Sequence, residues 1–246
     1  MKHTLSYNEL LNKLPIASTQ FLDPLAYHLL NSIIRYGYRI DKPFTLTDDM
    51  LRYGVVGFSL PLMIFNNKPC SSVTIRKHRR VLQKLGVISY ETRSYKRGFI
   101  GLYTINKQKL CELVSVNYAK AVSIGALASI FTAEDHVSKD NRRRINRVLR
   151  FTATKSTDNP TLIALSPIFS YVYYLVLSMA TAVSSYTLKN LPKTLIKILN
   201  TSKPSIYRAL SSLKGLINYD SSCKVYSIAV SNSAVSTTRT RSEVLV

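Results

Sequence analysis

The sequence RVLQKLGVISY at residues 80–90 decides the fold, because it returns as RALSSLKGLINY at residues 208–219. In each copy the leucines are spaced as one face of a helix requires, and a glycine follows, Gly86 or Gly215. Glycine readily adopts the left-handed conformation that ends many helices. A β-branched and aromatic run comes next, as at the start of a strand. The repeat therefore predicts two related modules, each with a helix, a tight stop and a β-hairpin.

The charge of the chain is far from that of an ordinary globular protein. Lys and Arg number 34 against 13 Asp and Glu, which gives a net charge of +21 over 246 residues. Residues 71–109, around the first copy of the repeat, hold ten Lys and Arg and a single acid, Glu91. Such a field attracts polyanions, either nucleic acid or an anionic membrane surface. The overlap of the basic cluster with the helix and hairpin favours nucleic acid over a merely solvated face.

Helix signals mark the first module. We expect a short leading helix at 6–14, a helix capped by Asp23 that ends near Gly37, and a helix over 48–53 capped by Thr47. Asp48 and Asp49 then stand at a helix N-terminus, where capping explains this carboxylate pair better than catalysis. An apolar insertion at 58–65 predicts a strand or an extra turn, and residues 66–69 predict a loop.

A basic helix follows, from Ser71 or Ser72 to about Leu85, and we expect it to read DNA. Ile75, Leu82 and Leu85 face inward in this interpretation, and a second stripe that includes Val73 faces outward. Strands are predicted at 87–92 and 99–105, with a basic turn at 93–98 between them. The residues that we expect to contact DNA here are Thr74, Arg76, Lys77, Arg80, Lys84, Arg93, Lys96 and Arg97.

The middle of the chain has helical periodicity with weaker boundaries. Residues 107–131 could form a linking or dimerising helix, and Asp140 or Asn141 could cap the next one. That second helix carries five arginines, for which phosphate contact competes with a solvated face or with pairing to acids elsewhere; they are Arg142, Arg143, Arg144, Arg147 and Arg150. Residues 152–160 are predicted to be a polar linker.

The second module begins with an uncharged helix over about 167–184. A helix at 193–199 follows, and Pro204 then opens the second reading helix, with Ile206, Leu210 and Leu213 toward the core. A short hairpin is expected at 216–219 and 225–229, and the Ser- and Thr-rich residues beyond 231 are predicted to be disordered. The residues expected to contact DNA are Lys203, Tyr207, Arg208, Ser211 and Lys214.

Several other functions lack the residues that they need. Cys70, Cys111 and Cys223 are far apart, which indicates a reducing compartment without disulfides. The sequence has no GxxxxGK[ST] loop for ATP and no HxH pair to hold a metal beside a nucleophilic tyrosine. We therefore expect no catalytic residues, metal or cofactor, and no enzyme activity. Residues 162–183 are long enough to span a bilayer, but Pro167 and several Ser, Thr and Tyr residues favour a buried helix.

Together these motifs resemble tandem winged-helix DNA-binding proteins. In the first copy the resemblance rests on residues 74–78, Leu82, Leu85 and residues 86–88. In the second copy it rests on residues 205–210 and 215–217. It implies a mainly α fold with small β-hairpin wings: a first winged-helix domain at 1–110, a basic helical linker at 111–160, a second winged-helix domain at 161–230 and a tail at 231–246. Two such modules in a small basic chain resemble the replication initiators of plasmids, phages and phage satellites.

The resemblance implies a function as well as a fold. It implies sequence-specific binding of double-stranded DNA at repeated origin sites in the cytoplasm, on the nucleoid, with recruitment of host replication proteins. A homodimer is compatible with it. A winged-helix transcriptional regulator is the alternative, because the same module serves both roles. A membrane-associated basic protein is a third and weaker interpretation, which cell fractionation would test.

Overall fold

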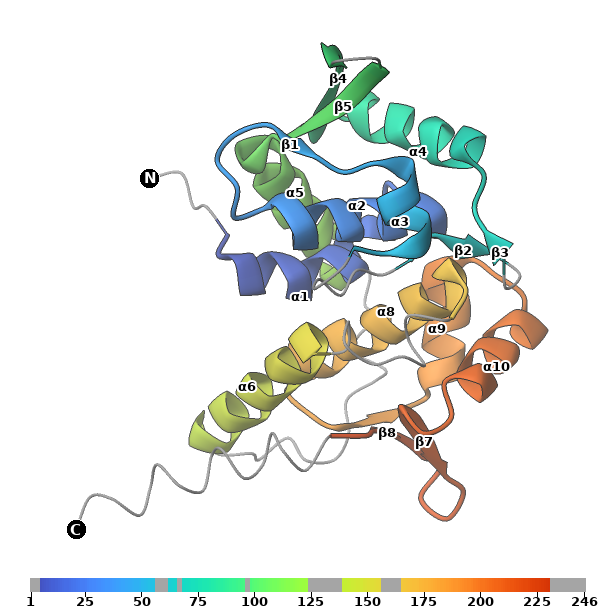
Figure 1. Cartoon of the computed structure of the whole chain (residues 1–246). Coiled ribbons are helices and arrows are strands. Elements are labelled where there is room, and N and C mark those ends of the chain that lie inside the picture. The colour runs from blue at the N-terminus through green and yellow to red at the C-terminus, as the bar shows by residue number, and fades with distance from the viewer. Residues whose placement is uncertain are drawn as a thin grey trace. The chain divides into compact units, whose positions relative to one another are not determined.

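The computed structural model describes residues 5–55, 62–65, 68–95, 98–123, 139–155 and 165–230. Within them the chain is a mixed α+β protein, as the sequence predicted. Each predicted hairpin gains one further strand, so that the chain has two small three-stranded antiparallel sheets. The chain divides into two compact units. Unit 1 comprises Met1–Lys120 with Thr157–Tyr171, and unit 2 comprises Ala121–Ser156 with Val172–Val246 (Figure 1).

Unit 1 consists of helices around a small sheet (Figure 1). Its elements are α1 (Tyr7–Ser18), α2 (Pro24–Gly37), β1 (Phe44–Thr45), α3 (Asp48–Tyr53), β2 (Ile64–Phe65), β3 (Lys68–Pro69), α4 (Ser72–Lys84), β4 (Ile88–Tyr95), β5 (Gly98–Ile105) and most of α5 (Lys107–Ser123). The sheet order is β1-β5-β4, so the last strand lies in the middle. Phe44 pairs with Tyr103 on one side of β5, and Tyr90 pairs with the same tyrosine on the other.

The helix caps of unit 1 follow the sequence signals. Asp23 accepts hydrogen bonds from the amides of Leu25 and Ala26 at the start of α2, and Thr47 accepts one from the amide of Met50 at the start of α3. Each cap satisfies backbone donors that a helix leaves free at its first turn. Both of these predicted helix starts are therefore confirmed.

Three predictions for unit 1 need correction. The leading helix does not stop at Leu14 but runs through Pro15 to Ser18, because residues 14–18 are buried and the Pro15 carbonyl accepts a hydrogen bond from the Ser18 hydroxyl at 2.8 Å. Lys68 and Pro69 form a strand, not a loop, since a proline is tolerated in an edge pair. Leu85 is only half-buried, because it lies at the C-cap of α4, where the helix ends.

The hairpin of unit 1 is also longer than predicted. Pairing between β4 and β5 runs from Ile88 opposite Ile105 to Tyr95 opposite Gly98, so residues 93–95 are strand and not turn. The backbone hydrogen bonds of a ladder do not depend on which side chains point to solvent. The basic and polar residues 93–95 can therefore continue the strand, although their composition does not predict one.

Unit 2 holds the elements from α6 onward, except the first residues of α8, which belong to unit 1. They are α6 (Lys139–Lys155), the greater part of α8 (Pro167–Val183), β6 (Thr187–Lys189), α9 (Leu191–Leu199), α10 (Lys203–Ser212), β7 (Ile217–Asp220) and β8 (Val225–Ile228). The sheet order is β6-β8-β7, again with the last strand in the middle. Residues 152–155 belong to α6 and correct the prediction of a linker that begins at Thr152.

Burial explains the uncharged segment of the sequence. Every residue from Tyr171 to Ala180 in α8 is buried, so these positions have no place for an unpaired charge. Among the described residues, no helix has both the length and the apolar character needed to cross a membrane. The preference for a buried helix is thus supported by the surroundings of α8.

The two units share one order of elements. Apart from the β2-β3 pair, which lies between α3 and α4, the series α2-β1-α3-α4-β4-β5 in unit 1 corresponds to α8-β6-α9-α10-β7-β8 in unit 2. The two three-stranded sheets place their strands in the same order. In each series a glycine with positive φ follows the basic helix, Gly86 at +70° and Gly215 at +93°. The predicted glycine stops are confirmed, and the repeat extends well beyond the residues that first indicated it.

Some predictions concern residues outside the described ranges. They include the part of the 107–131 helix beyond Ser123, residues 156–160 of the predicted linker, the wing residues Lys96 and Arg97, and the tail from 231. The bounds of the four predicted domains stay a prediction.

Candidate nucleic-acid interface

The inner face of α4 is fixed in the core of unit 1. Ser71 caps the helix by accepting a hydrogen bond from the amide of Thr74, and Ile75 and Leu82 are fully buried. His78 and Arg79 lie between them on the same side and are also buried. The inward position of Ile75 and Leu82 was predicted from the sequence, and that of His78 and Arg79 was not.

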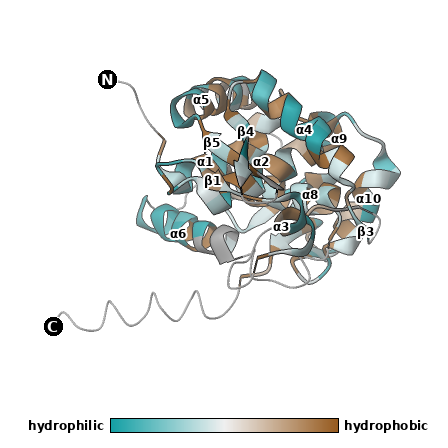
Figure 2. Cartoon of the chain, turned by 45° about the horizontal axis from the view of Figure 1, so that its top comes forward, coloured by the Kyte–Doolittle hydropathy of each residue, from teal (hydrophilic) through white to brown (hydrophobic). Residues whose placement is uncertain are grey.

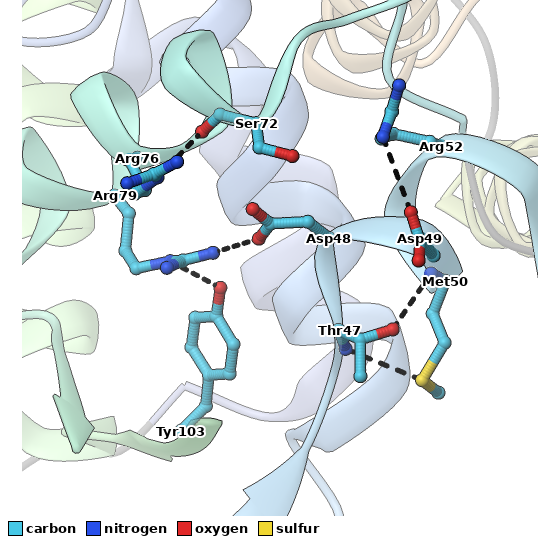
Figure 3. Close-up of polar contacts among 9 residues, drawn as sticks. All are labelled: Thr47, Asp48, Asp49, Met50, Arg52, Ser72, Arg76, Arg79 and Tyr103. Atoms are coloured by element: carbon cyan, nitrogen blue, oxygen red, sulfur yellow. Dashed lines mark hydrogen bonds and ion pairs between the residues drawn. The ribbon is translucent and has the colours of Figure 1, made fainter. Parts of the chain in front are cut away.

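Arg79 joins α4 to both α3 and the sheet (Figure 3). The residue is 5% exposed, its Nε donates a hydrogen bond to the Tyr103 hydroxyl at 2.7 Å, and its guanidinium forms an ion pair with Asp48. The guanidinium also lies 4.0 Å from the centre of the Tyr90 ring. A buried charge is tolerated only when it is paired in this way. Thr47 is the cap of α3, and Asp48 in the first turn of that helix instead neutralises the charge that orients α4.

His78 connects α4 to the first turn of α2. Its Nδ1 atom lies 3.4 Å from Oδ2 of Asp23, the residue that caps α2. Burial alone would raise the pKa of Asp23, but the contact with His78 and the amide hydrogen bonds of Ala26 and Leu25 lower that pKa below its ordinary value. The two polar residues on the inner face thus hold α4 at two separate places.

The outer face of α4 is basic and open. A cavity of about 470 Å³ is lined, among described residues, by Val73, Arg76, Lys77, Arg80, Val81 and Lys84. Val73 is 69% exposed, and all four of these cations are exposed as well. In the described part of the chain none of the four forms an ion pair; Arg76 only reaches back to the Ser72 carbonyl at 3.4 Å (Figure 3). We name these six lining residues the α4 groove.

The remaining sequence-predicted residues of unit 1 lie apart from the groove or play a local role. Thr74 is half-buried, and its hydroxyl lies 3.0 Å from that of Ser71 in the helix cap. Arg93 is exposed on β4, with its guanidinium 3.5 Å from the carboxylate of Glu91. An exposed ion pair of this length is weak and leaves the cation available.

The basic helix of unit 2 is built on the same plan with fewer charges. Ile206, Leu210 and Leu213 are buried, as predicted. The five residues expected to contact DNA are all exposed, and they are Lys203, Tyr207, Arg208, Ser211 and Lys214. Arg208 Nε lies 3.5 Å from the Pro204 carbonyl of its own helix.

The arginines of α6 lie on the outside of unit 2. Arg142, Arg143 and Arg144 are exposed, while Val148 and Leu149 bury the opposite side. Arg143 lies 3.7 Å from Asp140, an exposed pair within the same turn. Figure 2 shows α6 largely in the hydrophilic colour. The helix therefore presents a basic surface of its own.

In the part of the chain that the structure describes, no three His, Cys, Asp or Glu side chains come together as metal ligands, and the three cysteines are free. His28 is buried, and that burial lowers its pKa to about 4, while its Nε2 lies 2.9 Å from the Leu62 carbonyl. This histidine is a core residue bonded to the backbone.

In comparisons with known proteins, no protein-family model, curated protein or solved structure matches this chain.

Proposed function

We propose that this chain is a sequence-specific double-stranded DNA-binding protein with two winged-helix modules, and that it is the replication initiator of a plasmid, phage or phage satellite. The shared element order supports the fold part of the proposal. A helix, strand, helix, basic helix and two-stranded hairpin, with the final strand central in the sheet, is the arrangement expected of a winged helix. The choice of an initiator over a transcriptional regulator rests on the resemblance of two small basic modules in one chain.

The proposal of DNA binding rests on the α4 groove. Arg79 and His78 hold the inner face of α4, and its outer face presents four cations that form no ion pair in the described part of the chain. Arg76 and Lys77 stand in the first half of the helix, which is the part that contacts base edges when a reading helix enters the major groove. Arg80 and Lys84 are then available to phosphates, which supply affinity without sequence preference.

Selection of bound duplexes from a random pool tests sequence specificity. We expect the full chain to recover a defined site, and Arg76→Ala to relax the preference at one G·C pair by about 1–3 kcal/mol, because arginine reads guanine by two hydrogen bonds. Arg39→Ala is the matched control, since this exposed arginine of unit 1 stacks on Tyr7 outside the α4 groove. Equal losses on selected and random duplex for both variants would refute base reading by α4.

Val73 gives a second test of the same groove. An exposed aliphatic side chain among cations is suited to the methyl group of thymine. Replacement of one thymine of the site by uracil should weaken the wild-type complex several-fold and leave the Val73→Ala complex unchanged. Val116→Ala on α5, where the valine is 49% exposed, should keep the wild-type response. The measurement is fluorescence anisotropy with the two duplexes.

The position of the selected sites in the source genome distinguishes a replication initiator from a transcriptional regulator. Repeated sites clustered at an origin support an initiator, and sites that overlap a promoter support a regulator. A plasmid that carries only this gene and its sites should replicate in the host and should fail to do so with Arg76→Ala. Failure of the wild-type plasmid would refute the initiator role while leaving DNA binding intact.

A further inference from the structure

Three tyrosines of unit 2 gather at one surface beside the basic helix. Tyr207 on α10 is 47% exposed and Tyr219 on β7 is 55% exposed. Tyr219 is the pairing partner of Tyr226 on β8, and the centres of their rings are 4.7 Å apart. Burial raises the pKa of Tyr226, and so do Tyr207 and Tyr219, so the Tyr207 phenol lies close enough to Tyr226 to act on it electrostatically. We name Tyr207, Tyr219 and Tyr226 the tyrosine cluster.

The corresponding place in unit 1 is closed. In the repeat Arg79 aligns with Tyr207 and Tyr90 aligns with Tyr219, and Tyr90 pairs with Tyr103 as Tyr219 pairs with Tyr226. Arg79 covers the Tyr90 ring at 4.0 Å and is neutralised by Asp48, and Tyr103 is fully buried. Unit 2 therefore has the same tyrosine pair as unit 1. The position of the covering Arg79 is occupied in unit 2 by an exposed tyrosine, Tyr207.

The surroundings of the cluster are basic. The Nζ atom of Lys203 lies 5.8 Å from the centre of the Tyr207 ring. Two more cations are exposed on the elements that carry the cluster, Arg208 on α10 and Lys224 in the turn between β7 and β8. Asp220 is the acid at the hairpin tip, and its carboxylate accepts hydrogen bonds from the amide and hydroxyl of Ser222. A polyanion fits this surface better than an acidic or neutral protein surface of equal size.

Exposed aromatic faces beside cations select a particular form of nucleic acid. The bases of a duplex are stacked on one another and hide their faces, whereas an unpaired strand can place them on aromatic side chains. Because every base has such a face, this binding tolerates any sequence. We infer that the tyrosine cluster is a stacking surface for unpaired bases of single-stranded DNA, so that unit 2 holds an opened strand. This inference rests on the proposal that the chain binds DNA and adds a second substrate class to it.

The test uses the full chain and a short single-stranded oligodeoxynucleotide that contains one 2-aminopurine, whose fluorescence falls when it stacks. Tyr219→Ala should weaken single-strand binding by about 5- to 150-fold, the effect expected for one lost stacking partner, and should restore the fluorescence. Tyr219→Phe should behave as wild type, because phenylalanine keeps the ring. Tyr53→Ala is the matched control, since this tyrosine of α3 is 64% exposed and outside the cluster.

Duplex measurements keep the inference separate from the proposed function. Tyr219→Ala should bind the selected duplex as the wild type does, which also shows that the variant is folded. Unchanged single-strand binding by Tyr219→Ala, or an equal loss on duplex and single strand, would overturn the inference. Loss of a host protein complex without loss of single-strand binding would identify the cluster as a protein contact and overturn it as well. Absence of any sequence-preferring duplex binding by the wild type would instead refute the proposed function.

Discussion

Arg79 and Arg80 are neighbours in sequence with opposite surroundings. Arg79 is buried against Asp48, Tyr90 and Tyr103, and Arg80 faces the α4 groove. Removal of a buried charge leaves its partner unpaired, which costs far more than the loss of an exposed side chain. A run of charged residues on one helix can thus contain both a structural contact and a ligand contact.

This difference predicts the outcome of two matched substitutions. Arg79→Met should lower the free energy of unfolding by about 3 kcal/mol, because Asp48 loses its partner inside the fold. Arg80→Met should change stability by no more than about 0.5 kcal/mol and should weaken DNA binding. Urea denaturation followed by circular dichroism measures both. A similar small stability effect for the two variants would contradict the role given to Arg79.

The lowered pKa of Asp23 predicts that the stability of the fold depends on pH. Its pKa in the folded protein lies below the ordinary value of 3.8, so the ionised carboxylate favours folding. That contribution is complete above pH 3.8 and is lost as the pH falls through the lowered pKa. Asp23→Asn keeps a good helix cap but removes the charge beside His78. The stability gap between wild type and variant should therefore be present above pH 3.8 and should close as the pH falls through the lowered pKa; a gap that stays open below that pKa would refute this.

At the scale of elements, the two glycine stops connect each basic helix to its hairpin. Gly86 and Gly215 have φ values of +70° and +93°, and the nearest atom to an added Cβ is 3.9 Å away at Gly86, with none within 4 Å at Gly215. A side chain would therefore meet no obstacle, and the restriction lies in the backbone conformation.

The glycine prediction follows from this conformation. Gly86→Ala and Gly215→Ala should each cost about 1–2 kcal/mol, the penalty for an L-residue in the left-handed region. The corresponding Asn variants should lose less, because asparagine tolerates this region better. Thermal unfolding of the four variants is the measurement. Equal losses for Ala and Asn would point to a cause other than backbone conformation.

At the scale of the whole molecule, the net charge predicts how binding responds to salt. Arginines that contact phosphate release counterions, and each contributes about 0.9 to the slope of log affinity against log salt concentration. Simultaneous replacement of Arg142, Arg143 and Arg144 on α6 by Gln should reduce that slope by about 2.7 on selected and random duplex alike. Titrations at several salt concentrations give the slope, and an unchanged slope would assign these arginines to a solvated face.

Local signals in the sequence predicted most of the helices and both hairpins, but not the edge strands β1 and β6. Capping residues, leucine spacing and glycine stops predicted α2, α3, α4, α10 and both hairpins, because each of these signals acts within a few residues of the chain. The extents of α1, β3 and the unit 1 hairpin were predicted less well. Their ends depend on burial and on strand partners that the local sequence does not contain.

The sequence by itself determined that the chain has two copies of one helix-and-hairpin unit and that its basic residues concentrate on the first. Only the tertiary structure decided which cations face outward, since Arg79 and Arg80 differ in their partners and not in their chemistry. It also decided that Arg79 covers the Tyr90 ring in unit 1 while the corresponding Tyr219 is exposed in unit 2. The physical reason is that a buried charge needs a partner from another element, and α3 supplies Asp48 for Arg79 from 31 residues away.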